Sequence, residues 1–234
     1  MSIPDNIARV RERICIAAGR VGRNPDEIIL MAVSKTFSPE SIREAYESGV
    51  HMFGENRVQE FAGKAEKLRD LADARWHMIG HLQSNKAAKA AEVFHAVDSV
   101  DSLKLAQKLN EAARNADKKL SALIEVNVGG EAAKSGVAGN SQELENLLAA
   151  APGLEHLEIR GLMTIPPFTE NPQQARPYFR QLRDLRERIA ARSVPGVRME
   201  VLSMGMSHDF EVAIEEGSTC VRVGTAIFGR RARA

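Results

Sequence analysis

The chain has 234 residues, of which 44% are hydrophobic and 27% are charged, as in ordinary globular proteins with a sizeable core. The formal net charge is +1, so no overall field favours binding to nucleic acid or to a membrane surface. No apolar run approaches the roughly 20 residues that span a bilayer, and two cysteines are too few for a disulfide scaffold.

The N-terminal segment MSIPDNIARVRERICIAAGR is amphipathic and lacks the apolar block of a secretory signal. It predicts a helix from about Ile7 to Ala18. A helical mitochondrial presequence is the alternative, and Asp5 and Glu12 argue against it. We therefore expect a cytoplasmic protein.

Short β-rich runs then alternate with helical patterns along the chain. The candidate strands are Ile28 to Val33, His51 to Phe53, Arg75 to Ile79, Val93 to Val97, Leu120 to Val128, Leu157 to Met163, Met199 to Leu202 and Cys220 to Val223. Eight strands are the number in a closed (β/α)8 TIM barrel, and near-continuous apolar runs fit parallel strands covered on both faces. No linker divides the chain, so residues 1–234 are predicted to form a single α/β barrel domain with an extra N-terminal helix.

Three of the helices between the strands carry start signals. Ser38–Glu40 supplies a cap, a proline at the first helical position and an acid in the first turn. Asn140–Glu143 resembles a capping box with the asparagine as cap. Asn171-Pro172 opens another helix, and the charged run 180–192 is interpreted as its solvated side rather than as a nucleic-acid surface.

The functional face of such a barrel is built where strands end and helices begin. Two segments at that face have the pattern of an anion site, Ser203–Ser207 and Gly224-Thr225. Small residues let backbone N–H groups approach a phosphate, and a following helix N-terminus adds a favourable dipole. The alternative, that both segments are simply capped turns, stays open on the pattern alone.

Three side chains at the strand ends are further candidates for chemistry. Lys35 follows an apolar strand directly, and burial favours a neutral amine that can form an imine with an aldehyde. From the residues alone, a lysine pointing into water is the simpler interpretation. Arg222 lies inside a strand and needs a partner, either a ligand or a carboxylate of the barrel core. Asn56 and Asn127 can each hydrogen-bond a ring hydroxyl but say little alone.

The histidines do not predict a metal site. His77 and His81 are four residues apart, which is a metal-ligand spacing only on a helix, and here they straddle a strand end without an adjacent glutamate. The chain also has no GxSxG elbow, no P-loop and no GxGxxG fingerprint.

Seven stretches run in order across nearly the whole chain: AVSKTFSPESIREAYESG, FGENRVQE, WHMIGHLQSNK, KSG, RGLMTIPP, LSMGMSHDFEVAIEEGST and VRVGTAIFG. Together they resemble the YggS/PROSC family of pyridoxal phosphate homeostasis proteins. GENxVQE, IGxLQSNK and SMGMSxDxxxAI are long and specific. The resemblance implies a (β/α)8 barrel of the alanine racemase N-terminal type (fold-type III), with an added N-terminal helix.

The resemblance also implies roles for individual residues. Lys35 of the VSK motif would hold pyridoxal 5'-phosphate (PLP) as an internal aldimine, a Schiff base, with Arg222 facing the pyridine nitrogen and Asn56 near the ring. Lys134 of KSG would be a secondary PLP site. The residues implied to hold the phosphate are Ser203, Gly205, Ser207, Gly224 and Thr225. Two residues or segments depart from the pattern: His208, where a small or acidic residue is expected, and the tail of residues 230–234, which is more basic than expected.

An arginine at the pyridine nitrogen disfavours protonation of that nitrogen and makes PLP a weaker electron sink. Racemization needs two positioned acid/base groups, and similar barrel racemases take the second, a tyrosine, from an additional β domain. The chain stops soon after the eighth strand, and Tyr46 and Tyr178 fall on apolar helix faces, so we expect no second base.

The prediction is therefore a PLP-binding protein of vitamin B6 homeostasis that buffers or delivers PLP and is not an enzyme, with apo-PLP enzymes as transient partners. A fold-type III enzyme such as an amino-acid racemase, with its second base from a partner subunit, is one alternative. A barrel for another phosphate ligand, with Lys35 merely solvated, is the other.

Overall fold

The computed structural model describes residues 2–131 and 134–229, so Arg230-Arg231 lies outside the described residues. Eight parallel strands close into a barrel in sequence order, with β1 pairing with both β2 and β8. The strands are β1 (Ile29–Val33), β2 (Met52–Glu55), β3 (Arg75–Met78), β4 (Ala96–Val100), β5 (Leu120–Glu125), β6 (Leu157–Met163), β7 (Val197–Met206) and β8 (Cys220–Val223). The predicted eight-stranded α/β barrel is confirmed.

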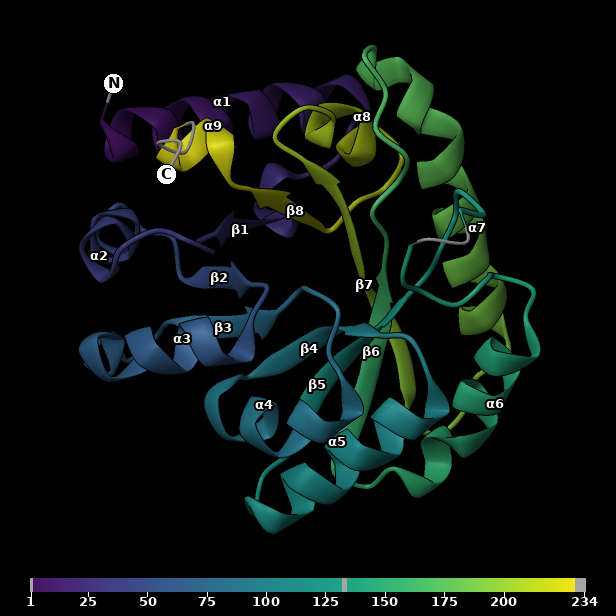
Figure 1. The fold of residues 1–234 in the computed structure, drawn as a ribbon. Coiled ribbons are helices and arrows are strands. Elements are labelled where there is room, and N and C mark those ends of the chain that lie inside the picture. The colour runs from purple at the N-terminus through teal and green to yellow at the C-terminus, as the bar shows by residue number, and fades with distance from the viewer. Residues whose placement is uncertain (1, 132–133, 230–234) are drawn as a thin grey trace.

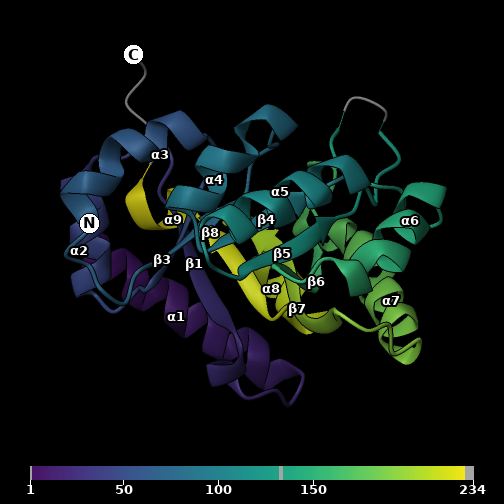
Figure 2. The ribbon, with the colours of Figure 1, turned by 90° about the horizontal axis from the view of Figure 1, so that it is seen from below.

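Helices surround the sheet on its outer face (Figures 1 and 2). They are α1 (Ile3–Arg20), α2 (Pro39–Glu47), α3 (Val58–Ala65), α4 (Ala87–Val93), α5 (Leu103–Asn115), α6 (Gln142–Ala150), α7 (Arg176–Ala191), α8 (Phe210–Glu215) and α9 (Thr225–Phe228). Short 3-10 turns lie at Pro25–Glu27, Glu66–Leu68, Ser84–Lys86, Ala151–Gly153 and Pro172–Ala175. In the part of the chain that the structure describes, no helix has the length and apolar character needed to cross a membrane.

The predicted N-terminal helix is present as α1, which lies alongside α8 and α9 (Figure 1). Its buried face is apolar, and Ser2 caps it in a reciprocal capping box with Asp5. Asn6 Nδ2 donates to the carbonyl of Ile227 at 2.7 Å, and Arg13 forms an ion pair with Glu211 at 3.0 Å. The first helix therefore ties the N-terminal segment to the elements that surround β8.

The core between strands and helices includes a row of aromatic rings. Trp76 of β3 contacts Phe53 of β2 and Phe61 of α3, with ring centroids 5.0 and 4.7 Å apart. Phe61 also stacks on Phe94 at 4.9 Å. Such pairs add to the stabilisation from buried apolar area, and they fix α3 against β2 and β3 on one side of the site described below.

Three predicted strands have a boundary that is wrong by three or more residues. Val93 ends a helix, and β4 begins at Ala96. β5 ends at Glu125 because the chain leaves the sheet, apart from a single bridge between Val126 and Val137. β7 extends to Met206, so most of the predicted anion segment belongs to a strand rather than to a loop.

The fourth correction concerns the cap of α6. Ser141, not Asn140, caps this helix, with its Oγ accepting from the N–H of Leu144 at 3.3 Å. The predicted capping box fails because Glu143 instead accepts a 2.6 Å hydrogen bond from the N–H of Leu103, at the start of α5. A tertiary contact thus outcompetes the local one.

The charged run 180–192 is only partly a solvated face. Arg180 and Arg183 reach the buried carboxylate of Glu216 at 3.0 and 3.2 Å, and Arg176 joins them from the first turn of α7. Burial alone would raise the pKa of Glu216, but Arg180 and Arg176 outweigh it and lower that pKa. The run therefore also anchors α7 to the end of α8.

Gly161 of β6 occupies a position where a side chain does not fit. A Cβ atom there would lie 1.8 Å from the carbonyl oxygen of Val201 in β7. We predict that Gly161→Ala destabilises the protein by about 3 kcal/mol or more, since the two strands must separate. Urea unfolding of the purified variant measures this. Gly63→Ala is the control: Gly63 lies in α3 with open space around it, and the change should stabilise by about 0.5–1 kcal/mol.

Candidate functional site

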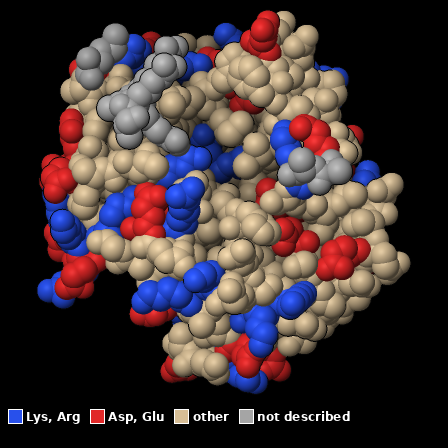
Figure 3. Space-filling model, viewed as in Figure 1, with Lys and Arg blue, Asp and Glu red and all other residues tan. Residues whose placement is uncertain are grey.

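A cavity of about 380 Å³ opens at the carboxyl ends of the strands, the face where the sequence places its candidate residues. Figure 3 shows lysine and arginine side chains gathered in a hollow of the surface over β1 and β8. The lining residues are Val33, Lys35, Phe37, Asn56, Ile79, Gly80, Ile165, Met206, Ser207, His208, Arg222, Gly224 and Thr225. The cavity is within the size range of small-molecule sites, and it brings together Lys35, Asn56, Ser207, Arg222, Gly224 and Thr225.

Lys35 is half-buried and sits in a tight bend directly after β1. Thr36, the next residue, has φ +68°, which is rare for a β-branched residue. Its N–H donates to Glu60 Oε1 at 2.6 Å, which holds the bend closed. The backbone that carries the Lys35 amine is therefore fixed by a contact from α3.

A buried ion-pair cluster supports this bend from behind. Lys64 of α3 donates to Glu55 at 2.8 Å and Glu60 at 3.2 Å, and also reaches the carbonyl of Ser34 at 3.3 Å. Ser34 Oγ donates to the same Glu55 oxygen at 2.7 Å. Burial raises the pKa of Glu55, although Lys64 and Ser34 oppose that rise. The cluster therefore fixes Ser34, on the other side of Lys35.

Ser207 and the start of α9 form a small cup of polar groups. The Ser207 Oγ accepts from the N–H groups of Gly224 at 3.2 Å and Ala226 at 3.4 Å, and Thr225 lines the same wall. N–H groups that converge on one oxygen at the start of a helical turn can equally bind the oxygens of a phosphate.

The structure places the other two predicted phosphate residues behind the cavity rather than on its wall. Ser203 is completely buried, and its Oγ accepts a 2.7 Å hydrogen bond from Arg222. Gly205 has φ +93°, and a Cβ there would lie 2.5 Å from Cβ of Ala213. Gly205 thus allows β7 to pass close to α8, and Ser203 holds the arginine.

Arg222 is 3% exposed and reaches the cavity from the middle of β8. Its guanidinium donates to Ser203 Oγ and to the carbonyl of Thr164, both at 2.7 Å. Burial lowers its pKa, and the carboxylates of Asp98, Glu125 and Asp209 work in the opposite direction without a hydrogen bond to it. Its direct partners are therefore neutral acceptors, which leaves the positive charge available to a ligand.

Asn56 lines the cavity, and its Oδ1 is buried without a hydrogen-bond partner. Such an atom is costly unless a ligand or water satisfies it. Asn56 thus offers an unused acceptor to whatever fills the cavity.

Two further contacts shape the cavity wall. The rings of Phe37 and Phe228 stack with their centroids 4.6 Å apart, and His208 Nε2 lies 3.1 Å from the carbonyl oxygens of residues 169 and 170.

The two remaining candidates, Asn127 and Lys134, both bind Glu131 in the loop between them. Asn127 Nδ2 donates to the carbonyl of Glu131 at 2.8 Å, and Lys134 Nζ forms an ion pair with the Glu131 carboxylate at 2.8 Å. Neither residue lines the cavity. His77 and His81 pair separately with Asp98 at 3.0 Å and Asp101 at 3.2 Å, and the described residues contain no group of three metal-ligand side chains.

Glu125 and Asp209 are electrostatic features that the sequence analysis missed. Burial raises the pKa of Glu125 to about 7, and Asp101 adds to the rise while Arg222 and His81 oppose it. One of its oxygens, Oε2, is buried without a partner. Burial also raises the pKa of Asp209, which accepts from the N–H of Met206 at 2.6 Å. Asp209 stands in the SMGMSxDxxxAI motif and Glu125 stands in none, but for both residues the burial near Arg222 comes from closure of the barrel, which no local pattern shows.

Comparisons with known proteins agree with this geometry. Residues 6–232 match the family model described as the alanine racemase N-terminal domain. A pyridoxal phosphate homeostasis protein from Aquifex aeolicus is 46% identical over 231 residues, which is 99% of each chain. Another from Pseudomonas aeruginosa is 44% identical over 98% of this chain and 96% of its own.

Solved structures also resemble this chain. PipY of Synechococcus elongatus, solved with PLP bound, superposes with a TM-score of 0.83 at 36% identity, covering 97% of this chain and all of that one. An alanine racemase from Clostridium difficile has a TM-score of 0.70 at 17% identity, covering 98% of this chain and 58% of its own. The second likeness shows a shared barrel fold.

The high pKa of Glu125 predicts an unusual dependence of stability on pH. An acid that titrates near 4.5 when unfolded and near 7 when folded makes the native state progressively less favourable as pH rises through that window. Glu125→Gln removes this effect, so the variant should be more stable than the wild type by up to about 3 kcal/mol at pH 8, and the gain should shrink towards pH 5.

Urea unfolding at pH 5, 6, 7 and 8 measures the difference. Glu12→Gln, at an exposed position on α1, is the matched control and should give a pH-independent difference. A Glu125→Gln gain that is the same at pH 5 and pH 8 would show that this carboxyl is ionised throughout.

Proposed function

Since the chain belongs to the family of pyridoxal phosphate homeostasis proteins, we propose that it binds PLP at the barrel mouth and buffers or delivers it, acting as a carrier in the cytoplasm. The observation that carries the proposal is the single cavity that holds the Lys35 amine, the Ser207 cup and the Arg222 guanidinium together. An aldehyde, a phosphate and a ring nitrogen are the three features of PLP that these groups match.

The residues of the cavity fit this cofactor in chemical type. Ser207, with the backbone of Gly224 and Thr225, would hold the phosphate, because its hydroxyl already gathers N–H groups at the start of α9. Asn56 would use its unpartnered Oδ1 toward the ring hydroxyl. Ser203 and Gly205 would act indirectly, the first through Arg222 and the second through the packing of α8.

PLP supplies an aldehyde that forms a reversible imine with a neutral lysine amine. The bend at Thr36 and the cluster around Lys64 hold the Lys35 backbone at the cavity wall. Arg222 keeps a positive charge where the ring nitrogen would lie, and that charge disfavours a proton on the nitrogen. Without that proton the cofactor is a poor electron sink, which suits storage better than catalysis.

Racemase chemistry would need a second acid or base on the opposite side of the substrate. Of the two tyrosines, Tyr46 packs edge-on against His51 at 5.0 Å and Tyr178 packs on the core, so neither lines the cavity. The described residues that line the cavity thus include Lys35 and no tyrosine, which favours the carrier over an amino-acid racemase. Transient contact with apo-PLP enzymes would then be the route of delivery.

Loading purified protein with PLP tests the assignment of the site. We predict a yellow protein that absorbs near ~420 nm, as expected for an imine of PLP with a lysine. Lys35→Ala should abolish this band, and borohydride reduction followed by mass spectrometry should place the cofactor on Lys35. Ser207→Ala should keep the band but weaken retention of PLP by about tenfold, through loss of one hydrogen bond.

Lys104→Ala, at an exposed position on α5, is the control and should leave the band unchanged. Full absorbance in Lys35→Ala would refute the proposed linkage. A colourless wild type that binds a sugar phosphate would support the alternative of a different phosphate ligand.

The carrier role predicts little chemistry on amino acids. With PLP-loaded protein in D2O and a panel of L-amino acids, α-proton exchange should be no faster than with free PLP, because the described residues that line the cavity supply no tyrosine as a second acid or base. Proton NMR follows the exchange. Saturable exchange that disappears in Lys35→Ala would instead establish the racemase alternative.

A further inference from the structure

A second cavity, of about 390 Å³, lies at the opposite end of the barrel, where the strands begin. The interior of an eight-stranded barrel is normally filled by layers of bulky side chains. Here β4 and β5 contribute the small residues Ala96 and Ser121 to the lining, which leaves space. We call this space the lower cavity, and it shares no lining residue with the cavity around Lys35.

One wall of the lower cavity is apolar. It is formed by Ile29, Met31, Met52, Leu123 and Val201. Ile29 is 41% exposed, a high value for an isoleucine within a barrel strand. Apolar surface that remains in contact with solvent inside a concave site is typical of a ligand pocket.

The other wall carries N–H donors that lack acceptors among the described residues. Arg75 is exposed, and its guanidinium forms no ion pair or hydrogen bond with the described residues. His95 Nδ1 accepts the N–H of Trp76 at 3.1 Å, so the ring proton is on Nε2. Its pKa is lowered to about 4, mainly by burial and then by Arg75, so the ring is a neutral donor at neutral pH.

Arg160 adds a further donor, because its Nε is buried without a hydrogen-bond partner. Its Nη2 is paired with Glu200, and Glu158 lies 3.9 Å from the Nε. The carboxylate of Asp98 also faces this cavity, but His77 engages both of its oxygens at 3.0 and 3.2 Å. Among the described residues of this lining, Arg75 therefore carries a positive charge that has no paired carboxylate.

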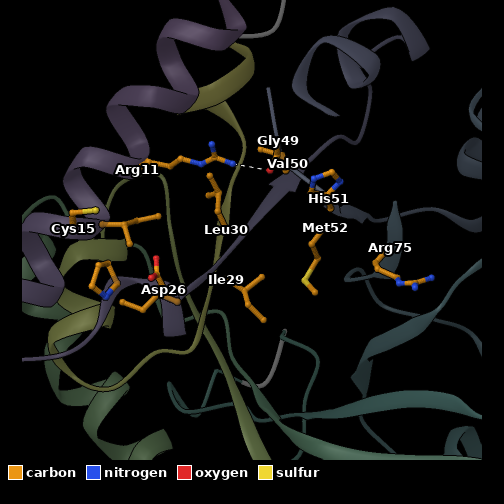
Figure 4. A pocket seen from close by; sticks show the side chains of 13 residues that line it. Arg11, Cys15, Asp26, Ile29, Leu30, Gly49, Val50, His51, Met52 and Arg75 are labelled. Carbon is orange, nitrogen blue, oxygen red and sulfur yellow. Dashed lines mark hydrogen bonds between the residues drawn. The ribbon is translucent and has the colours of Figure 1, made fainter. Parts of the chain in front are cut away.

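The lower cavity adjoins a second pocket that leads to the surface. A neighbouring pocket between α1, β1 and β2, of about 460 Å³, shares Ile29, Met52 and Arg75 with it. Figure 4 shows Arg75 at one side of this pocket, across Met52 and Ile29 from Arg11, whose guanidinium is bound to the carbonyl of Gly49 at 2.7 Å. Arg75 thus borders both spaces, at the point where a ligand would pass.

We propose that the lower cavity binds a small organic monocarboxylate with a branched aliphatic body. The carboxylate would be held by Arg75 with the Nε2–H of His95, and the aliphatic body would lie on the wall that contains Ile29. A guanidinium and a carboxylate match in charge and in geometry. The apolar wall disfavours inorganic phosphate, which has no apolar part.

Isothermal titration of the full chain with sodium 4-methylpentanoate at neutral pH tests this site. We expect saturable one-to-one binding with a dissociation constant of about 1 mM or tighter. The neutral analogue 4-methylpentanamide should bind at least about tenfold more weakly. Arg75→Gln should weaken binding of the acid by a similar factor, and it lies at an exposed position that tolerates the change.

Arg188→Gln is the matched control, because it removes one exposed arginine on α7 away from this cavity, and it should leave the affinity unchanged. Saturating PLP should also leave it unchanged, since the two cavities share no residue. Absence of saturable binding, equal binding of acid and amide, or displacement by PLP would each overturn the proposal.

Discussion

The pairing of β1 with β8 is the constraint on which the site depends. In this register Met31 lies beside Arg222 and Ala32 beside Val223, so the residues that follow the two strands, Lys35 and Gly224, come out at the same edge. Parallel strands place their carboxyl ends together, and here the first and last strands of the described barrel do so. Any change that opened this seam would separate the Lys35 amine from the polar cup around Ser207 without altering either group.

A buried positive charge is the second organising feature. Arg222 is held by neutral acceptors, and three carboxylates lie around it without contacting it. A buried charge without a direct counter-ion is costly. The field of the three carboxylates stabilises the charged form of Arg222, and an electron-rich atom of a ligand would stabilise it further. Burial, with a smaller contribution from Asp101, raises the pKa of Glu125 to about 7, and Arg222 opposes that rise, which links the stability of the fold to the electrostatics of the cavity.

The strand count, the α/β order and the placement of Lys35 could be predicted from the sequence, because each depends on local pattern: apolar runs, turn residues and a lysine at a strand end. The roles of Ser203 and Gly205 could not, because they depend on how far β7 extends and on which side chain faces Arg222. The pairing of Lys64 with Glu55 and Glu60 could not be predicted either: the two glutamates stand in the GENxVQE motif, but they meet Lys64 only because α3 packs on the barrel beside β2.

The two cavities of the barrel lie on opposite sides of one layer of side chains. Met31 lines the lower cavity, and its register partner Arg222 lines the upper one, so a single layer of side chains divides them. Asp98 belongs to that region: His77 holds its carboxylate from below, while its charge favours the protonated form of Arg222 above. The dividing layer is therefore polar rather than a conventional apolar fill. Beyond this layer the lower cavity is lined by small residues such as Ala96 and Ser121 and the upper one by Gly80 and Gly224, so on both sides side chains too short to fill the barrel leave space.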